Sequence, residues 1–97
     1  MKPSDALCGN EAKILSIVEK YGYTNPRIFG STAYGKDKEE SDLDILVERS
    51  SNRGSMLKLV HLQIELSELL GVPVDIKTEK MIPEHSRSQV VEESVGL

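Results

Sequence analysis

Two pieces of the sequence, Gly30-Ser31 and Ser41-Asp42-Leu43-Asp44, decide the fold. Arg27-Ile28-Phe29 predicts a short strand that leads directly into Gly30-Ser31. Residues 32–41 are polar and mostly charged, which is typical of a loop, here one that starts with a helical turn. Residues 43–48 give the clearest strand signal, because Leu43, Ile45 and Val47 alternate with Asp42, Asp44 and Leu46.

The acids of this second strand point to metal chemistry. Asp42 and Asp44 are two residues apart, so both carboxylates lie on one face of the strand, about 6.5–7 Å apart along the backbone. Magnesium prefers oxygen ligands, and two such carboxylates can hold one ion or each anchor one ion of a pair. An acid pair on a strand is more often simply solvated. The Gly30-Ser31 turn changes the balance, because glycine lets phosphate approach the backbone and the serine hydroxyl can bind it.

Two other phosphate and metal motifs overlap the same residues and are rejected. Residues 30–36 fit the first seven positions of the P-loop pattern, but the eighth is Asp37, where a hydroxyl is required. A strand follows, and not the helix whose N-terminus would face the phosphates. An EF-hand loop over residues 37–44 would place Asp42 at its sixth position, which needs glycine.

The rest of the chain supplies the supporting elements. Periodicity predicts helices over residues 11–21 and 56–70 and a last helix from Pro83 through residue 94. Residues 73–77 predict a third strand, and residues 50–55 a turn-rich connection. The helix signals that fix these ends are Asn10, Gly22, Ser55 and Gly71. The order α-β-loop-β-α-β-α predicts one α/β domain over residues 1–97, a small mixed sheet of about three strands packed with helices.

Bulk properties exclude several functional classes. The chain has 97 residues, a net charge of -4 and 4% aromatic residues, so neither a basic field nor a stacking platform attracts nucleic acid. Cys8 is the only cysteine, which excludes an internal disulfide and fits a reducing, cytoplasmic setting. No apolar run approaches the ~20 residues that span a bilayer, and the N-terminus does not resemble a signal peptide.

The chain resembles the polymerase-beta-like nucleotidyltransferase superfamily, in its minimal branch. The resemblance rests on Gly30-Ser31 and Ser41-Asp42-Leu43-Asp44 at the signature spacing. It continues through residues 72–76, which look like the strand bearing a third acid, and through residues 81–83 and 90–95, which look like the closing helix. Nearly the whole chain is covered, and the resemblance implies the polymerase-beta-like nucleotidyltransferase fold.

The resemblance also implies a site and a reaction. It assigns magnesium binding, with two ions, and catalysis to Asp42, Asp44 and Asp75. It assigns nucleotide binding to Gly30, Ser31, Lys36 and Ser41. The implied reaction is in-line attack of a hydroxyl on the α-phosphate of ATP, which transfers AMP and releases pyrophosphate. Asp75 would bind the metal or take the proton of the attacking hydroxyl.

One departure concerns the loop after Gly30-Ser31. Relatives in this branch often carry arginines there, whereas this loop reads Thr32-Ala33-Tyr34-Gly35-Lys36. Lys36 supplies a point charge and not a bidentate phosphate clamp. This departure therefore bears on nucleotide affinity and on activity itself.

The size of the chain resembles the antitoxin half of paired MNT–HEPN modules. There the nucleotidyltransferase binds a helical HEPN ribonuclease and adenylylates one of its tyrosines, so we expect a HEPN-type toxin partner. A competing hypothesis is an interaction module that neutralises its partner by binding alone. A drug-modifying enzyme would need a substrate pocket that so short a chain has little material to build. The choice of triphosphate and the formation of a homo-oligomer stay open.

Overall fold

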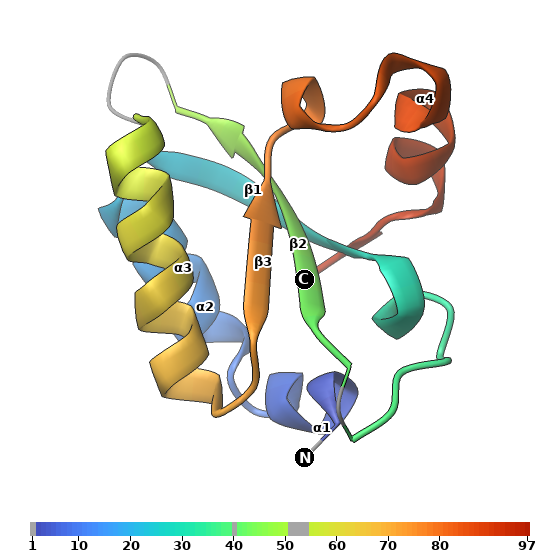
Figure 1. Cartoon of the computed structure of the whole chain (residues 1–97). Helices are drawn as coiled ribbons and strands as arrows, with labels where there is room; N and C mark the ends of the chain where they lie inside the picture. Colours follow the sequence, from blue (N-terminus) through green and yellow to red (C-terminus); the bar gives the residue numbers. More distant parts are fainter. Residues whose placement is uncertain (1, 40, 51–54) are drawn as a thin grey trace.

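A four-stranded mixed sheet forms the centre of the computed structural model, which describes residues 2–39, 41–50 and 55–97. Strand β2 (Leu43–Arg49) lies between β1 (Tyr23–Phe29), which is antiparallel to it, and β3 (Val74–Lys77), which is parallel. Strand β4 (Val95–Gly96) pairs antiparallel with the outer edge of β1. The strand order is therefore β3-β2-β1-β4 (Figure 1).

Helices cover the sheet unequally. Figure 1 shows α2 (Glu11–Lys20) and α3 (Met56–Leu70) on one face of the sheet and α4 (Glu84–Glu93) beyond the other. The short helix α1 (Pro3–Leu7) lies at one end of the strands (Figure 1). Two 3-10 turns complete the described elements, η1 (Gly30–Thr32) directly after β1 and η2 (Glu79–Met81) after β3.

The alternation in β2 decides which face is buried. Leu43, Ile45 and Val47 point to the α2–α3 side and are almost fully buried, so Asp44 and Leu46 point to the other face. The core between the sheet and the two helices also contains Ile14, Val18, Ile28, Leu59, Leu62, Leu66, Leu70, Val74 and Ile76. The acids therefore lie on the face that α2 and α3 leave open.

Helix α3 begins and ends as its flanking residues predict. The Ser55 hydroxyl accepts a hydrogen bond from the Lys58 amide at 3.2 Å, which caps the first turn. Gly71 follows the last turn with φ +71°, a left-handed conformation that glycine adopts without strain. The chain thus reverses at Gly71, and β3 returns parallel to β2, with α3 as the crossover.

The C-terminal segment corrects the prediction of about three strands. The last helix ends at Glu93. Val95, which was expected in the closing helix, pairs instead with Ile28, and Gly96 pairs with Arg27. These two residues form a fourth strand. Val95 continues the apolar spacing of residues 90 and 91, which is why the sequence pattern favours a longer helix. Strand pairing is favoured over a longer helix because it satisfies backbone hydrogen-bonding groups along the edge of β1.

The N-terminal half departs from expectation in three details. Helix α1 was not predicted, since five residues are too few to show periodicity. Asn10 lies at the N-cap position of α2 as predicted, but its side chain makes no cap hydrogen bond; its amide donates instead to the Ala6 carbonyl at 2.8 Å. Strand β1 starts before the Asn25-Pro26 punctuation and absorbs it as a bulge, with Asn25 at φ +50° and a register shift between Thr24 and Arg27.

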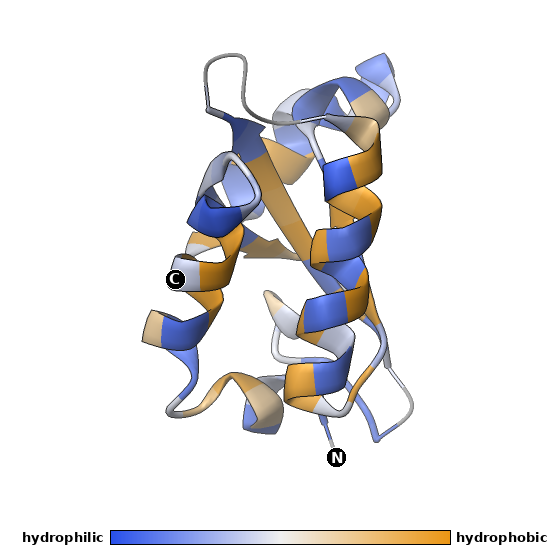
Figure 2. Cartoon of the chain, turned by 90° about the vertical axis from the view of Figure 1, so that its left-hand side faces the viewer, coloured by the Kyte–Doolittle hydropathy of each residue, from blue (hydrophilic) through white to orange (hydrophobic). Residues whose placement is uncertain are grey.

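The outer surface of α3 carries apolar side chains. Figure 2 shows hydrophobic residues recurring along this helix on the side turned to the viewer. The most exposed of them are Met56, Leu57, Val60 and Ile64. Within the described ranges, no helix has the length and apolarity that crossing a membrane requires. Residues 51–54, part of the predicted turn-rich connection, lie outside the described residues.

Candidate active site

Two of the three predicted acids lie side by side on the open face of the sheet. The register pairs Phe29 with Asp44 and Asp44 with Asp75, so these three residues form one row across β1, β2 and β3. Side chains in one such row point to the same face. Asp42 is exposed and precedes β2 by one residue, so it lies outside this paired row.

Gly30 touches the central acid. A β-carbon placed on Gly30 would lie 2.4 Å from Oδ2 of Asp44, a distance that real β-carbons do not show. Gly30 also has φ +74°, which disfavours any residue with a β-carbon. The glycine of the Gly-Ser turn is therefore required for two reasons, and the Asp44 carboxylate occupies the space that its missing side chain leaves.

The electrostatics of the row favour a bound cation. The pKa of Asp44 rises from 3.8 to about 6, chiefly because the carboxyl is half-buried and further because Asp75 and, less strongly, Asp42 are negative. Lys77 opposes this rise. Its Nζ lies 3.5 Å from Oδ2 of Asp75, and both side chains are about two-fifths exposed. A divalent cation would relieve the repulsion between these carboxylates.

The acids fit magnesium as part of a shared site. Within residues 2–39, 41–50 and 55–97, no three acidic, histidine or cysteine side chains are gathered into a ready metal cage. Magnesium does not need one, because it usually takes one or two carboxylates and completes its shell with phosphate oxygens and water. The Asp44–Asp75 row beside the open Gly-Ser turn offers that incomplete set.

The loop after the turn is held by its own backbone. The Gly30 carbonyl accepts hydrogen bonds from the amides of Ala33 at 3.1 Å and Tyr34 at 3.3 Å, and the Ser31 carbonyl accepts one from Lys36 at 2.8 Å. Lys36 is exposed, and its side chain is free to reach a ligand from the loop. Backbone hydrogen bonds thus hold the conformation of the Gly-Ser turn without a bound nucleotide.

The far end of the loop is anchored elsewhere. The Ser41 hydroxyl accepts a hydrogen bond from the Lys38 amide at 2.7 Å, so in this structure it organises the turn before β2. Asp37 is buried, and its Oδ2 accepts hydrogen bonds from the Ser4 amide at 2.9 Å and the Ser4 hydroxyl at 2.8 Å. These bonds lower the pKa of Asp37 and tie the loop to α1. The rejection of the P-loop is confirmed, because this loop enters strand β2.

One wall of the site was not foreseen from the sequence. Arg27 donates from Nε to the Ser94 hydroxyl at 2.6 Å and from its terminal nitrogen to the Ser94 carbonyl at 3.0 Å. The Tyr34 hydroxyl, in the loop, contacts the Glu93 carboxylate at the end of α4. The C-terminal end of α4 is therefore attached to the sheet and to the Gly-Ser loop together. The sequence signal for this wall is that Arg27 and Phe29 are two residues apart on one strand, which places both side chains on the same face of the sheet.

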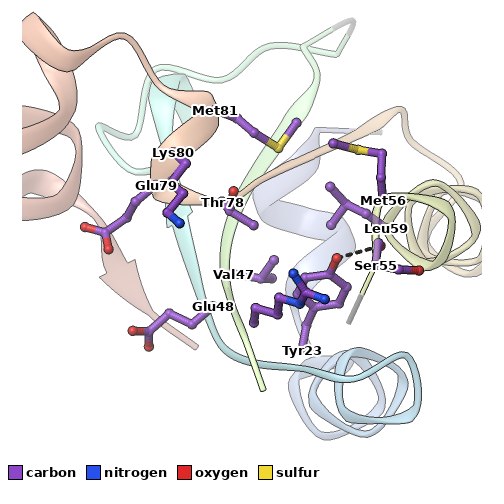
Figure 3. Close-up of a pocket in the computed structure, with 11 residues that line it drawn as sticks. Tyr23, Val47, Glu48, Ser55, Met56, Leu59, Thr78, Glu79, Lys80 and Met81 are labelled. Carbon is purple, nitrogen blue, oxygen red and sulfur yellow. Dashed lines mark hydrogen bonds between the residues drawn. The ribbon is translucent and has the colours of Figure 1, made fainter. Parts of the chain in front are cut away.

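A sizeable hollow lies away from the acids. It has a volume of about 540 Å³ and lies between the end of β2, the start of α3 and η2 (Figure 3). Figure 3 shows Met56 and Met81 facing each other across it, and the Tyr23 hydroxyl donating to the Ser55 carbonyl at 2.7 Å. None of the predicted site residues lines it.

The comparisons with known proteins agree with the geometry. The family model of the nucleotidyltransferase domain matches residues 12–96, a range that includes the Gly-Ser turn, the acid row and β4. The chain belongs to the nucleotidyltransferase family. This nucleotidyltransferase is 42% identical over 85 residues to MJ0435 of Methanocaldococcus jannaschii, named a candidate protein adenylyltransferase, covering 88% of this chain and 90% of that one. It is 35% identical over 77 residues to the protein adenylyltransferase MntA of Thermococcus cleftensis, covering 79% and 77%.

Solved structures place the nucleotidyltransferase in the minimal branch. One described as a candidate minimal nucleotidyltransferase is 36% identical, with a TM-score of 0.84 over 97% of this chain and 95% of that one. A toxin–antitoxin structure with AMP-PNP is 24% identical, with a TM-score of 0.74 over 90% of this chain and 71% of that one, and shows the fold alone. The expected family and fold are confirmed, apart from the fourth strand.

Proposed function

We propose that this nucleotidyltransferase transfers AMP from magnesium-bound ATP to a tyrosine hydroxyl of a HEPN-type toxin and acts as its antitoxin. The observation that carries the proposal is the contact between Gly30 and the Asp44 carboxylate, with Asp75 beside it in the same row. A phosphate bound at the Gly-Ser turn would lie against the carboxylates. This is the proximity that nucleotidyl transfer requires.

Each residue then has a defined task. Asp42, Asp44 and Asp75 would hold magnesium, which when bound neutralises charge on the attacking and leaving oxygens. Gly30, Ser31 and Lys36 would hold the triphosphate, and Ser41 would fix the loop that carries Lys36. The acceptor oxygen forms a bond to the α-phosphorus while the bond to pyrophosphate breaks. Asp75 would take the proton of the acceptor hydroxyl.

The acceptor is proposed to be a protein because the acid row lies on an open face. Relatives named protein adenylyltransferases support this choice. The attacking hydroxyl would reach the α-phosphate opposite the pyrophosphate. Since pyrophosphate would lie at the turn after β1, the acceptor would enter from the β3 side.

A second function is favoured by the exposed apolar side chains on α3. Leu57 is 69% exposed and Ile64 51%, and both would be covered if a partner packed on this helix. An interaction module could neutralise a toxin through such a contact without any transfer. The two hypotheses differ in whether the acids are needed.

Transfer of label from α-labelled ATP to the purified HEPN partner tests the proposal. We expect magnesium-dependent labelling that Asp44→Asn lowers by roughly 100-fold or more, because a ligand of the metal is lost. Asp5→Asn removes an exposed carboxylate of α1 and serves as the matched control, which should label normally. If the Asp42→Asn, Asp44→Asn protein neutralises the toxin fully and no label ever moves, the interaction module is the correct hypothesis.

A further inference from the structure

Lys77 shares the open face with the acids. It lies two residues after Asp75 on β3, so their side chains point the same way, and the register pairs it with Leu46 as it pairs Asp75 with Asp44. Its Nζ is 3.5 Å from Oδ2 of Asp75. Lys77 is thus a cation placed at the β3 edge of the acid row, where sequence reasoning assigned none.

The other cations near the site are placed differently. Arg27 pairs with Leu46 on the side of β2 away from Lys77. Its guanidinium donates hydrogen bonds to the hydroxyl and the carbonyl of Ser94. Lys36 is exposed in the loop after the Gly-Ser turn. Lys77, by contrast, lies directly beside one of the acids, with its Nζ 3.5 Å from Oδ2 of Asp75. It is therefore the best-placed source of positive charge for a site whose loop lacks arginine.

The ion pair that holds Lys77 is weak. Its 3.5 Å separation is long for a charged hydrogen bond, and the side chains are 39% and 43% exposed, so water competes for both groups. A lysine on a flexible four-carbon stem can leave such a partner easily. Magnesium would compete for the same Asp75 oxygens.

We propose that Lys77 is a displaceable counter-ion: it holds Asp75 in the free protein and moves to a nucleotide phosphate when the metal-bound nucleotide enters. This rests on the proposed function and adds a binding residue to it. In the free protein the ammonium partly neutralises Asp75 and its neighbour Asp44. In the complex the same ammonium meets the triphosphate, which a lysine binds well as a point charge. Lys77 would thus supply, from β3, positive charge for the phosphates that the arginine-free loop after Gly30-Ser31 does not supply.

The proposal predicts opposite changes in two affinities. Lys77→Met keeps most of the aliphatic stem and removes the charge. Manganese alone should bind about fivefold tighter, because a competing cation a few ångströms away is gone. Magnesium with α,β-methylene-ATP, which cannot undergo transfer, should bind about fivefold or more weakly, because a phosphate contact is lost. A purely structural role would change both affinities in the same direction.

Titration calorimetry of the full chain at about pH 8 measures both affinities. Lys80→Met, an exposed lysine of η2, removes the same charge away from the acids and should bind both probes as the wild type does. Lys77→Arg keeps the charge and should restore most of the nucleotide affinity.

The result separates this inference from the function on which it rests. If Lys77→Met changes neither affinity, or weakens both, the inference about Lys77 is overturned. The proposed function still stands in that case if Asp44→Asn abolishes nucleotide binding. If the wild type does not bind the magnesium–nucleotide complex at all, both fail. Opposite changes in the two affinities support both.

Discussion

Gly30 and Asp44 define the site at the scale of single residues. The carboxylate occupies the place where any other residue at position 30 would carry its β-carbon, and the backbone there is left-handed. Burial and the neighbouring acids raise the pKa of the same carboxylate to about 6. Under the proposed function, this pair of residues would set both the shape of the phosphate-binding turn and the affinity for a cation.

Gly30→Ala should separate backbone strain from loss of the cradle. Gly35 has a nearly identical φ of +70°, but a β-carbon there would meet nothing within 4 Å, so Gly35→Ala is the matched control. Both variants should lose about 1–2 kcal/mol of unfolding free energy in urea denaturation. Only Gly30→Ala should lose magnesium–nucleotide binding, by roughly tenfold or more, because the β-carbon displaces the Asp44 carboxylate. Equal binding by the two variants would contradict this role of Gly30.

Asp44 should also give the metal-free protein a pH-dependent instability. A carboxyl whose folded pKa lies above its unfolded value favours the folded state at low pH, and this contribution is lost as pH rises from about 4 to 6. Asp44→Asn should therefore be more stable than wild type above pH 6, by about 1 kcal/mol because water screens a half-buried group. Urea denaturation of both proteins across this range gives the difference. A difference that does not change with pH would refute the raised pKa.

At the scale of elements, parallel pairing of β2 with β3 brings the third acid and Lys77 to the site. The crossover through α3 makes this pairing, and Gly71 ends α3 shortly before β3 starts. On the other side, α4 and β4 form the wall through Arg27 and Ser94.

The Ser94→Ala variant tests that wall. The Ser94 hydroxyl accepts from Arg27 Nε and donates to the Val91 carbonyl, both at 2.6 Å, and the residue is buried. Loss of the hydroxyl leaves a charged donor short of an acceptor, so we expect a loss of about 1–3 kcal/mol of unfolding free energy. Ser88→Ala, on the exposed surface of α4, should change it by less than about 0.5 kcal/mol. Equal stabilities would show that the wall does not depend on this bond.

Sequence patterns predicted the elements that local signals specify. Alternation in β2 and the Ser55 and Gly71 signals of α3 depend on neighbouring residues, and both were predicted correctly. Strand β4 depends on pairing with a strand far away in the chain, and its two residues carry no period of their own. The same reason hid the Arg27–Ser94 bonds and the position of Lys77 beside the acids. Motif spacing suggested the site, and the strand register shows which of its side chains meet.

At the scale of the whole molecule, the site is an open face of a flat domain with extents of 35 × 31 × 19 Å. The acids lie on the side that α2 and α3 do not cover, and the 540 Å³ hollow lies at the other end of β2 (Figures 1 and 3). An open face suits a macromolecular acceptor, which brings its own surface to exclude water from the reaction. The account therefore depends on where the metal-bound nucleotide binds.

Paramagnetic broadening of amide signals locates that binding site most directly. Manganese with α,β-methylene-ATP is added to isotope-labelled protein, and the loss of each assigned signal reports its proximity to the ion. The account predicts that the amides of Gly30, Asp44 and Asp75 broaden first, and that Asp44→Asn abolishes the effect. Broadening centred on Glu48 and Glu79, at the hollow beyond β2, would contradict the assignment of the acid row as the nucleotide site.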